Sequence, residues 1–388
     1  MTVREVASPT RPVTPPQTPE TSVGKRPAWL ETLGRWGAQA VPVVAAVAAA
    51  LLVSALMIAA MGHDVVTAFD SLLTASFDTQ FGFVATLHRW VPLTLFALAF
   101  TIPLIAGRYN IGSEGQMLVG AAAAAGVGIS GSGLPAPVLL PLVLLAGILA
   151  GLVWAGIAAW LLDQFGVNEI LSTVLLNFVS FGVVLYTAQH LWPDPVGGFP
   201  MTDHVAPAAQ LPMLGSSPQF HSGVLLVLAV SILVILAIRY TVIGYELRSV
   251  GANPRAALIH GVSVRSVAIG ALVVGGALAG LAGSIEVAGV QGRLLEGMQS
   301  NYLQLGIIIG LIARGSVVAV PLVAFGISVL EIGASAMQRS AEVPVQMVLI
   351  VEALILIFIL IADILADRIT RRRAARAAVV QKLKESSA

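Results

Sequence analysis

The chain has 388 residues, of which 57% are hydrophobic and only 11% are charged, and its mean hydropathy is +0.90. A soluble domain of this length needs far less apolar sequence, so these values indicate a polytopic membrane protein. The absence of cysteine excludes disulfides, thiolate metal sites and covalent haem attachment. The formal net charge of +1 says little, because in a membrane protein the position of Lys and Arg relative to the spans matters more than their total.

The two ends of the chain differ in composition from the region between them. Residues 1–38 are rich in Pro and Thr and show no apolar periodicity, which predicts a disordered tail. We expect this tail to be retained, because the apolar stretch after it continues into a full-length span rather than a short signal peptide. A membrane domain is expected over residues 39–366, and residues 367–388 form a second, basic tail.

The apolar segments predict an all-α transmembrane bundle of about ten spans, because a helix needs roughly 20 apolar residues to cross a bilayer. Four shorter segments flank two polar interruptions, so an inverted repeat with interrupted helices is a hypothesis. The six strong segments are 41–62, 138–162, 170–190, 223–243, 267–286 and 345–362, and the four shorter ones are 91–106, 117–130, 304–313 and 317–333.

The distribution of basic residues predicts the orientation. Ten spans place both ends on the same side, and both ends are rich in Lys and Arg. The positive-inside rule therefore predicts that both termini are cytoplasmic. Following the chain from there puts the basic loop 244–266 inside, and puts the loop 191–222, which has no Lys or Arg, outside.

A glycine-rich polar stretch, residues 107–116, interrupts what would otherwise be one long apolar run. Irregular backbone at membrane depth survives only inside a bundle or beside a water-filled cavity, and in transporters such breaks mark the solute path. A solvated turn, with a carboxylate favouring the start of the next helix, is the alternative, and both interpretations stay open. The hydrogen-bonding side chains of the stretch are Asn110, Ser113, Glu114 and Gln116.

Two further polar residues are candidates for the solute path. Asn177 lies midway along the 170–190 segment, where a hydrogen bond to a neighbouring helix is the favoured interpretation and a path residue is the alternative. Glu352 lies in the middle of the last span, and an ionisable group at that depth is a functional candidate by default. A neutral Glu352, or one paired with Arg314, is the structural alternative.

The loop 244–263 has the pattern of a short docking helix. Asn253 is predicted as the N-cap, Pro254 as the first helical residue and Gly261 as the stop. Such a small apolar helix between two spans could fit a groove on a partner and pass its movement to the bundle, whereas a plain connecting loop is the alternative. The candidate coupling residues are Glu246, Arg248, Gly251, Asn253, Pro254, Ala256 and Ala257.

Small residues four apart predict close helix packing rather than chemistry. The three pairs are Gly147 with Gly151, Gly276 with Gly280, and Ala279 with Gly283.

Three stretches together, residues 109–116, 166–177 and 244–257, resemble the membrane permeases of ATP-binding-cassette (ABC) importers. The branch is the one that includes branched-chain amino acid, ribose and nucleoside permeases. The likeness is strongest to permeases that work with a BMP-type lipoprotein for nucleosides or simple sugars. It covers residues 85 to 365 and leaves the proline-rich tail outside.

The resemblance implies a transport subunit of the bacterial cytoplasmic membrane that is not itself an enzyme. Its implied partners are ABC ATPase subunits, a second permease subunit in a heterodimer, an extracytoplasmic solute-binding lipoprotein and membrane lipid, with no nucleic acid. The chain needs no cofactor of its own, and the only Gly-Lys pair, Gly24-Lys25, lacks the rest of a P-loop. The loop 244–263 would then be the coupling helix. The alternative is an ion-coupled secondary transporter of a small polar solute, with Glu352 or Glu114 as the titrating group.

Overall fold

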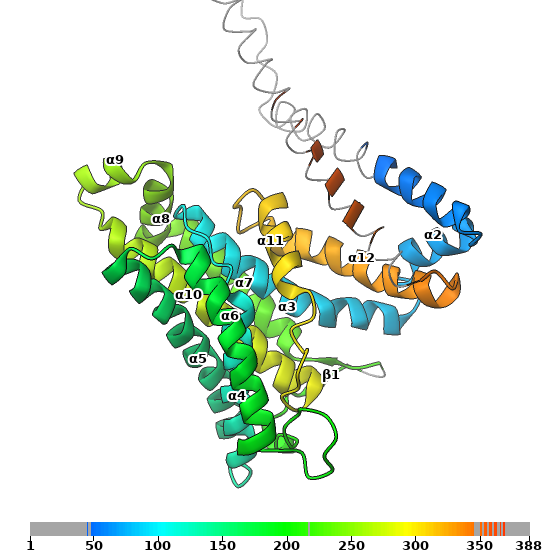
Figure 1. Cartoon of the computed structure of the whole chain (residues 1–388), viewed down its shortest axis with the longest axis horizontal. Helices are drawn as coiled ribbons and strands as arrows, with labels where there is room; N and C mark the ends of the chain where they lie inside the picture. Colours follow the sequence, from blue (N-terminus) through cyan, green and yellow to red (C-terminus); the bar gives the residue numbers. More distant parts are fainter. Residues whose placement is uncertain are drawn as a thin grey trace, which may run out of the picture.

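The computed structural model describes residues 45, 48–215 and 218–344, together with isolated residues between 350 and 368. These residues form a helical bundle with one small β-hairpin (Figure 1). The predicted tails 1–38 and 367–388 lie outside the described residues apart from Arg368, and so do Glu352 and most of the predicted span 345–362.

The elements follow one another mostly through short connections. After a helical stretch Ala48–Ala60 come α2 (Val65–Thr74), α3 (Gln80–Ile105), α4 (Ser113–Ser130), α5 (Ala136–Phe165) and α6 (Glu169–Tyr186), which continues as a π-helical turn (Thr187–Leu191). A 3₁₀ turn (Pro207–Ala209) and the antiparallel strands β1 (Met213–Leu214) and β2 (Phe220–His221) lead to α7 (Gly223–Tyr240). The chain ends with α8 (Val242–Ala252), α9 (Pro254–Ile259), α10 (Val264–Ile285) with a π-helical turn (Glu286–Gln291), α11 (Tyr302–Ile312) and α12 (Val320–Ser340).

Six described helices are long and apolar enough to cross a membrane. They are α3, α5, α6, α7, α10 and α12, which confirms a multi-span helical protein. The predicted segment 91–106 is the second half of α3, which already begins at Gln80. Its first half was missed because His88 and Arg89 lower the local hydropathy. The shorter helices α4 and α11 adjoin the two predicted polar interruptions, and the second interruption contains Arg314 and Gly315, both with positive φ.

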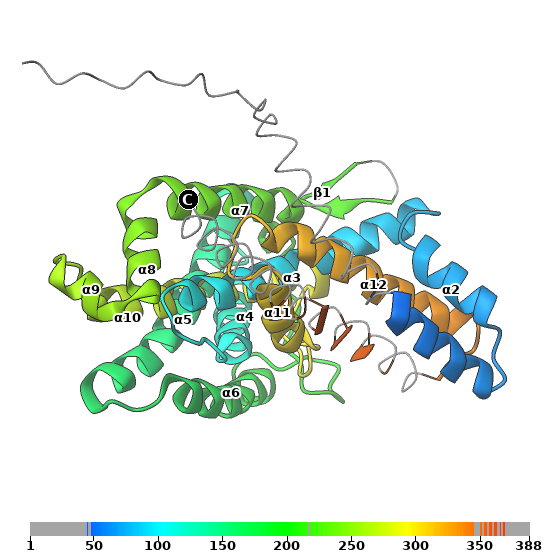
Figure 2. The ribbon, with the colours of Figure 1, turned by 90° about the horizontal axis from the view of Figure 1, so that it is seen from above.

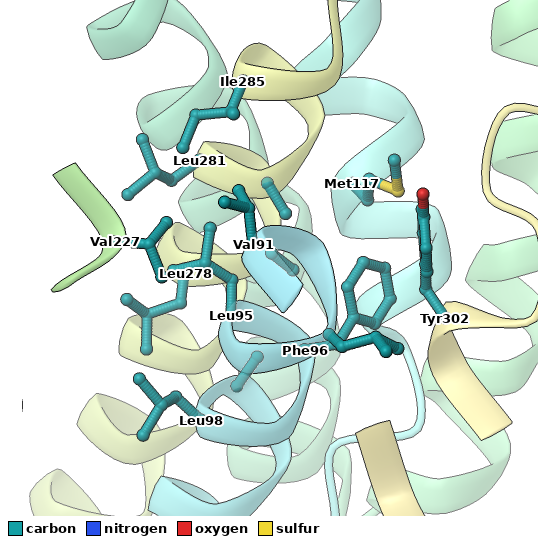
Figure 3. Close-up of a cluster of buried hydrophobic side chains, with 14 of the residues drawn as sticks. Val91, Leu95, Phe96, Leu98, Met117, Val227, Leu278, Leu281, Ile285 and Tyr302 are labelled. Atoms are coloured by element: carbon teal, nitrogen blue, oxygen red, sulfur yellow. The ribbon is translucent and has the colours of Figure 1, made fainter. Parts of the chain in front are cut away.

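The centre of the bundle is built from α3, α4 and α10 (Figure 2). In α3, 67% of the most apolar 18-residue window is buried, and in α10 the buried share is 72%. In α5 and in α7 the buried share of the corresponding window is only 28%. In the core, Phe96 and Leu95 of α3 pack near Met117 of α4 and Leu278 of α10 (Figure 3). The helices α5 and α7 are therefore peripheral, with most of their surface left for lipid or a partner.

The predicted small-residue contacts are confirmed between α5 and α10. A Cβ atom on Gly280 would lie 2.1 Å from the carbonyl oxygen of Gly147, and one on Gly151 would lie 2.3 Å from that of Gly276. Gly283 approaches the α4 backbone in the same way, 2.2 Å from the Met117 carbonyl oxygen. Only glycine lets these helix backbones approach so closely. Because lipid is as apolar as the helix surfaces, helices in a membrane associate through such close van der Waals contacts rather than through the hydrophobic effect.

The two ends of the bundle are different. Helix α9 projects from one end, and the long connection after α6 covers the other (Figure 1). That connection is attached by backbone hydrogen bonds to the π-helical turn of α10 and the loop after it. Leu211 N–H donates to the Ala288 carbonyl at 2.8 Å and Val205 N–H to the Gly292 carbonyl at 2.9 Å. The π-helical turn therefore holds this end of the molecule in place.

Candidate functional site

The polar interruption between α3 and α4 is a real break in the helix. The chain leaves α3 at Ile105, and Gly107 takes a left-handed conformation with φ of +73°, which a Cβ atom would disfavour. Helix α4 then starts at Ser113. The backbone between these helices is irregular, as the sequence predicted; Gly107 and Tyr109 at its start are exposed, whereas Asn110 and Gly112 are buried.

Two amide side chains inside the break bond each other. Asn110 Nδ2 donates to Gln116 Oε1 and Gln116 Nε2 donates to Asn110 Oδ1, both at 2.9 Å. Asn110 Oδ1 also accepts from Gly112 N–H at 3.2 Å, and both side chains are buried. Because almost all of their hydrogen-bonding capacity is used internally, this amide pair fixes the shape of the break.

Asn177 of α6 joins the break from the neighbouring helix. Its Oδ1 accepts from Gly115 N–H and its Nδ2 donates to the Ile111 carbonyl, each at 2.9 Å. This geometry confirms the favoured interpretation of an interhelical hydrogen bond. It leaves the role of Asn177 in a solute path as a prediction.

Ser113 and Glu114 lie at the start of α4. Ser113 is fully buried, and its Oγ has no hydrogen-bond partner in the part of the chain that the structure describes. Glu114 is half-buried in the first turn of the helix and hydrogen-bonds with Gln299. The position of Glu114 suits the helix dipole, so both interpretations of this carboxylate remain available.

The predicted docking helix is α9. Asn253 caps it by accepting from Ala256 N–H at 3.1 Å, Pro254 is its first residue, and Gly261 has a φ of +82° just after its end. The predicted cap, start and stop are therefore confirmed. Helix α8 was not predicted, although Ile243, Leu247 and Val250 repeat at helical spacing and are the signal that could have identified it.

Helix α9 has a buried anchor and an exposed apolar tip. Ala257 packs with Val250 and Val262, whereas Leu258 and Ile259 are 65% and 84% exposed. We call Leu258 and Ile259 the docking tip. The Ala257 contact joins α8 to α9, and we call residues 242–263 the docking segment.

Helix α8 touches the polar break. A Cβ atom on Gly251 would lie 1.9 Å from the carbonyl oxygen of Ile105, the last residue of α3, and one on Gly107 would lie 3.8 Å from Gly251 Cα. Arg248 donates from a guanidinium nitrogen to the Ile238 carbonyl near the end of α7. The structure thus brings together two candidate sites that the sequence identified separately: the docking segment and the break.

A partly buried ionic network that was not predicted from the sequence lies elsewhere in the core. The Arg89 guanidinium of α3 pairs with Glu331 of α12 and lies over the Tyr302 ring of α11, 4.4 Å from its centroid. The Tyr302 hydroxyl donates to Glu286 Oε1 at 3.1 Å. We call these four residues the Arg89 network. It links four helices at the point where α10 becomes π-helical.

A signal for this network was present in the sequence. Glu286 and Glu331 both fall inside predicted spans, where an ionisable group deserves the same attention as Glu352. Their partner could not be identified, because Arg89 is 242 residues from Glu331. Around the network, Phe96 packs against Tyr302 with ring centroids 5.7 Å apart, and Met117 lies near both side chains (Figure 3).

A metal centre has no support among the described residues, where no group of three or more His, Asp or Glu side chains is placed to hold an ion. The arrangement as a whole suits transport: an irregular polar break between α3 and α4, a projecting helical segment in contact with it, and ionisable groups elsewhere in the core.

Comparison with known proteins gives the same picture. Residues 82–360 match the family described as branched-chain amino acid transport system / permease component. The chain is 37% identical to the glucose ABC transporter permease protein TsgB13 of Haloferax volcanii, over 86% of this chain and 90% of that protein. It is 30% identical to the guanosine ABC transporter permease protein NupP of Bacillus subtilis, over 82% and 92% of the two chains.

A third relative is the nucleoside ABC transporter permease protein NupB of Lactococcus lactis, 27% identical over 90% of this chain and 98% of that protein. No solved structure gives a significant match. The family match covers most of the chain, including the break, the docking segment and the Arg89 network. The chain therefore belongs to the family of branched-chain amino acid transport system permease components.

Proposed function

We propose that this chain is the membrane permease subunit of an ABC importer for nucleosides or simple sugars. The observation that carries the proposal is the contact between the docking segment and the polar break, in a chain whose relatives are ABC permeases for glucose, guanosine and nucleosides. An ion-coupled secondary transporter is not favoured, because these relatives are subunits of ABC systems.

The assembly follows from the same reasoning. ATPase subunits bind the docking tip, a second permease subunit completes a heterodimer, and an extracytoplasmic solute-binding lipoprotein delivers the solute. The permease lies in the bacterial cytoplasmic membrane with about ten spans, related by an inverted repeat, and with both termini in the cytoplasm. Its permease domain covers residues 39–366.

Closure of the ATPases would press on α9, and the buried anchor Ala257 would carry that displacement into α8. Gly251 then transmits it to the end of α3 and the break. A bundle that converts between outward and inward openings needs such a lever, because the permease itself has no nucleotide site. The proposed coupling residues remain Glu246, Arg248, Gly251, Asn253, Pro254, Ala256 and Ala257.

The solute path would run along the polar break and its neighbours. Glu114 and the buried hydroxyl of Ser113 offer hydrogen bonds to sugar or ribose hydroxyls. Further from the break, at the end of α10, Glu286 and Tyr302 form a second polar group. The amides of Asn110, Gln116 and Asn177 would shape this path by holding its backbone. Glu352 is included in the path from its place in the sequence.

Coupling is tested with Ala256→Arg in the complete importer. We expect loss of ATP-dependent uptake, because a guanidinium on α9 prevents close docking, while the permease is still inserted. Gln164→Arg is the matched control, since it adds the same charge at an exposed position at the end of α5. Normal uptake by Ala256→Arg would remove the coupling assignment.

The solute is tested by uptake of radiolabelled guanosine, uridine, glucose, ribose and galactose in a strain that lacks its own carriers. Saturable uptake of at least one of these that stops when the ATPase subunit is deleted is the expected result. Uptake of all five at background level would refute the solute class. Glu114→Ala should change the KM or the rate for the transported solute if the break lines the path.

The orientation is tested by cysteine labelling, which is simple because the chain has no cysteine of its own. In cells that lack the ATPase subunits, a membrane-impermeant maleimide should label Val196→Cys in intact cells, whereas Leu258→Cys should react only after the membrane is opened. Both positions are exposed, so accessibility to the reagent depends on the side of the membrane. The reverse pattern would invert the proposed topology.

A further inference from the structure

A cavity of about 420 Å³ lies between α3, α7, α8 and α10, next to the docking segment. Its volume falls in the range of roughly 300–1,000 Å³ typical of small-molecule sites. The lining is almost wholly apolar, with Ile102, Val234, Leu247 and Val274 among its residues, and Glu246 supplies the one charged side chain. We call it the α7–α8 cavity.

The surroundings of the cavity point to the bilayer as the source of its occupant. Helix α7 forms one wall, and it is a peripheral helix whose other faces expose Leu225, Leu228 and Leu233. In a membrane these faces contact acyl chains. The cavity is not fully enclosed, and its wall belongs to a helix whose outer faces suit acyl chains.

The one charged group that lines the cavity suits an ammonium. Glu246 is half-buried, and no ion pair joins it to a cation among the residues that the structure describes. Arg248 follows two residues later on another face of α8, does not line the cavity, and donates to the Ile238 carbonyl. The Glu246 carboxylate can therefore pair with an ammonium at the edge of an apolar cavity.

Selection by this site would depend on the headgroup. An acyl chain gains little by moving from the bilayer into an apolar cavity, because lipid tails are as apolar as the side chains that line it. The primary ammonium of the headgroup does gain from binding, because it pairs with the Glu246 carboxylate and the surrounding bilayer has no carboxylate fixed in that position. A quaternary ammonium cannot donate that hydrogen bond.

We propose that the α7–α8 cavity binds one acyl chain of a phospholipid with a primary-amine headgroup, whose ammonium pairs with Glu246. The bound lipid braces α8 against α7 and α10. Because Gly251 of α8 lies against the end of α3, the lipid would stiffen the connection between the docking segment and the polar break. This proposal does not depend on which solute is transported.

The experiment measures lipid retained by the full-length permease purified with its partner subunits, after exchange into nanodiscs of phosphatidylethanolamine and phosphatidylcholine in equal amounts. Native mass spectrometry after release from the nanodisc counts bound lipid of each class. We expect phosphatidylethanolamine to exceed phosphatidylcholine by about fivefold, the ratio that one net hydrogen bond from the primary ammonium to Glu246 supplies. Equal retention of the two lipids would overturn the headgroup assignment.

The variant Gly270→Leu tests the cavity itself. A Cβ atom at Gly270 meets no atom within 4 Å, so the leucine side chain can grow into the cavity without a clash, and bound lipid should fall to background. Gly156→Leu is the matched control, because it has the same open space on α5 but lines no part of this cavity. Undiminished lipid on Gly270→Leu would refute the site.

The variant Glu246→Gln separates the headgroup from the chain. It should keep the bound lipid but lose the preference for phosphatidylethanolamine, because the amide is neutral. A preference that persists in Glu246→Gln, or a stronger retention of phosphatidylglycerol than of phosphatidylethanolamine by the unmodified chain, would contradict the pairing.

Discussion

Asn177 offers the most direct test of how the polar break is held. Replacing it by alanine removes two hydrogen bonds at once, from Gly115 N–H and to the Ile111 carbonyl, each 2.9 Å long. Asn177 is only 6% exposed, so both backbone groups lose their partner in a place that water reaches poorly. Interhelical hydrogen bonds in membranes contribute about 0.6 to 1.7 kcal/mol each. A buried polar group left unsatisfied costs about 1–3 kcal/mol.

The expected loss of stability for Asn177→Ala is therefore about 2–4 kcal/mol, a change of about 30- to 1,000-fold in the unfolding equilibrium. Equilibrium unfolding of the purified permease in bicelles with increasing SDS measures it. Asn177→Asp should not recover this loss, because its carboxylate still accepts from Gly115 N–H but sets an acceptor against the Ile111 carbonyl. Ser172→Ala is the matched control in the same helix, since the Ser172 hydroxyl bonds only the Glu169 carbonyl one turn away. A change below about 0.5 kcal/mol for Asn177→Ala would show that α6 does not brace the break.

Three further predictions concern stability. Gly280→Leu should cost at least about 1–3 kcal/mol and lower the melting temperature, because its Cβ would lie 2.1 Å from the Gly147 carbonyl oxygen and must part α5 from α10. Glu331→Gln should cost about 3–5 kcal/mol by leaving the Arg89 guanidinium without its counter-ion, and adding Arg89→Gln should recover part of that loss in the same unfolding assay. Burial, with the nearby His88, lowers the pKa of His221 to about 4, so the folded state resists its protonation. Between pH 6.5 and 4 the unfolded state binds the extra proton, and stability should fall by up to about 3 kcal/mol as the pH falls through that window, a dependence that His221→Phe removes.

Each of these has a result that would contradict it. Gly280→Leu should be compared with Gly156→Leu, where the new side chain meets open space, and equal melting temperatures would mean that the α5–α10 contact is looser than described. A double variant at Arg89 and Glu331 that is no more stable than Glu331→Gln would show that the pair is not coupled. An unchanged pH profile in His221→Phe would place the pH dependence on another group.

The sequence was sufficient wherever the signal was local. The runs of apolar residues identified most of the spans, because lipid forces backbone hydrogen bonds to be made within each segment. Asn253, Pro254 and Gly261 gave the cap, start and stop of α9, because each acts on backbone geometry within one turn. The polar stretch 107–116 was recognised as a break for the same reason.

The sequence was less informative about what the polar residues do. Asn110 and Gln116 were candidates for solute contact, and in the folded chain they bond each other. The residue type of an amide side chain does not indicate which group it will hydrogen-bond. The sequence pattern therefore left open whether Asn110 and Gln116 contact the solute or each other.

The sequence by itself determined that this is a helical membrane protein with a capped external helix and a broken span. Only the tertiary structure decided that Gly251 lies against the end of α3 and that Arg89 pairs with Glu331, 242 residues away. The physical reason is that propensity and hydropathy act over a few neighbouring residues. Contacts between helices depend on how distant faces pack, and no short stretch of the chain encodes that arrangement.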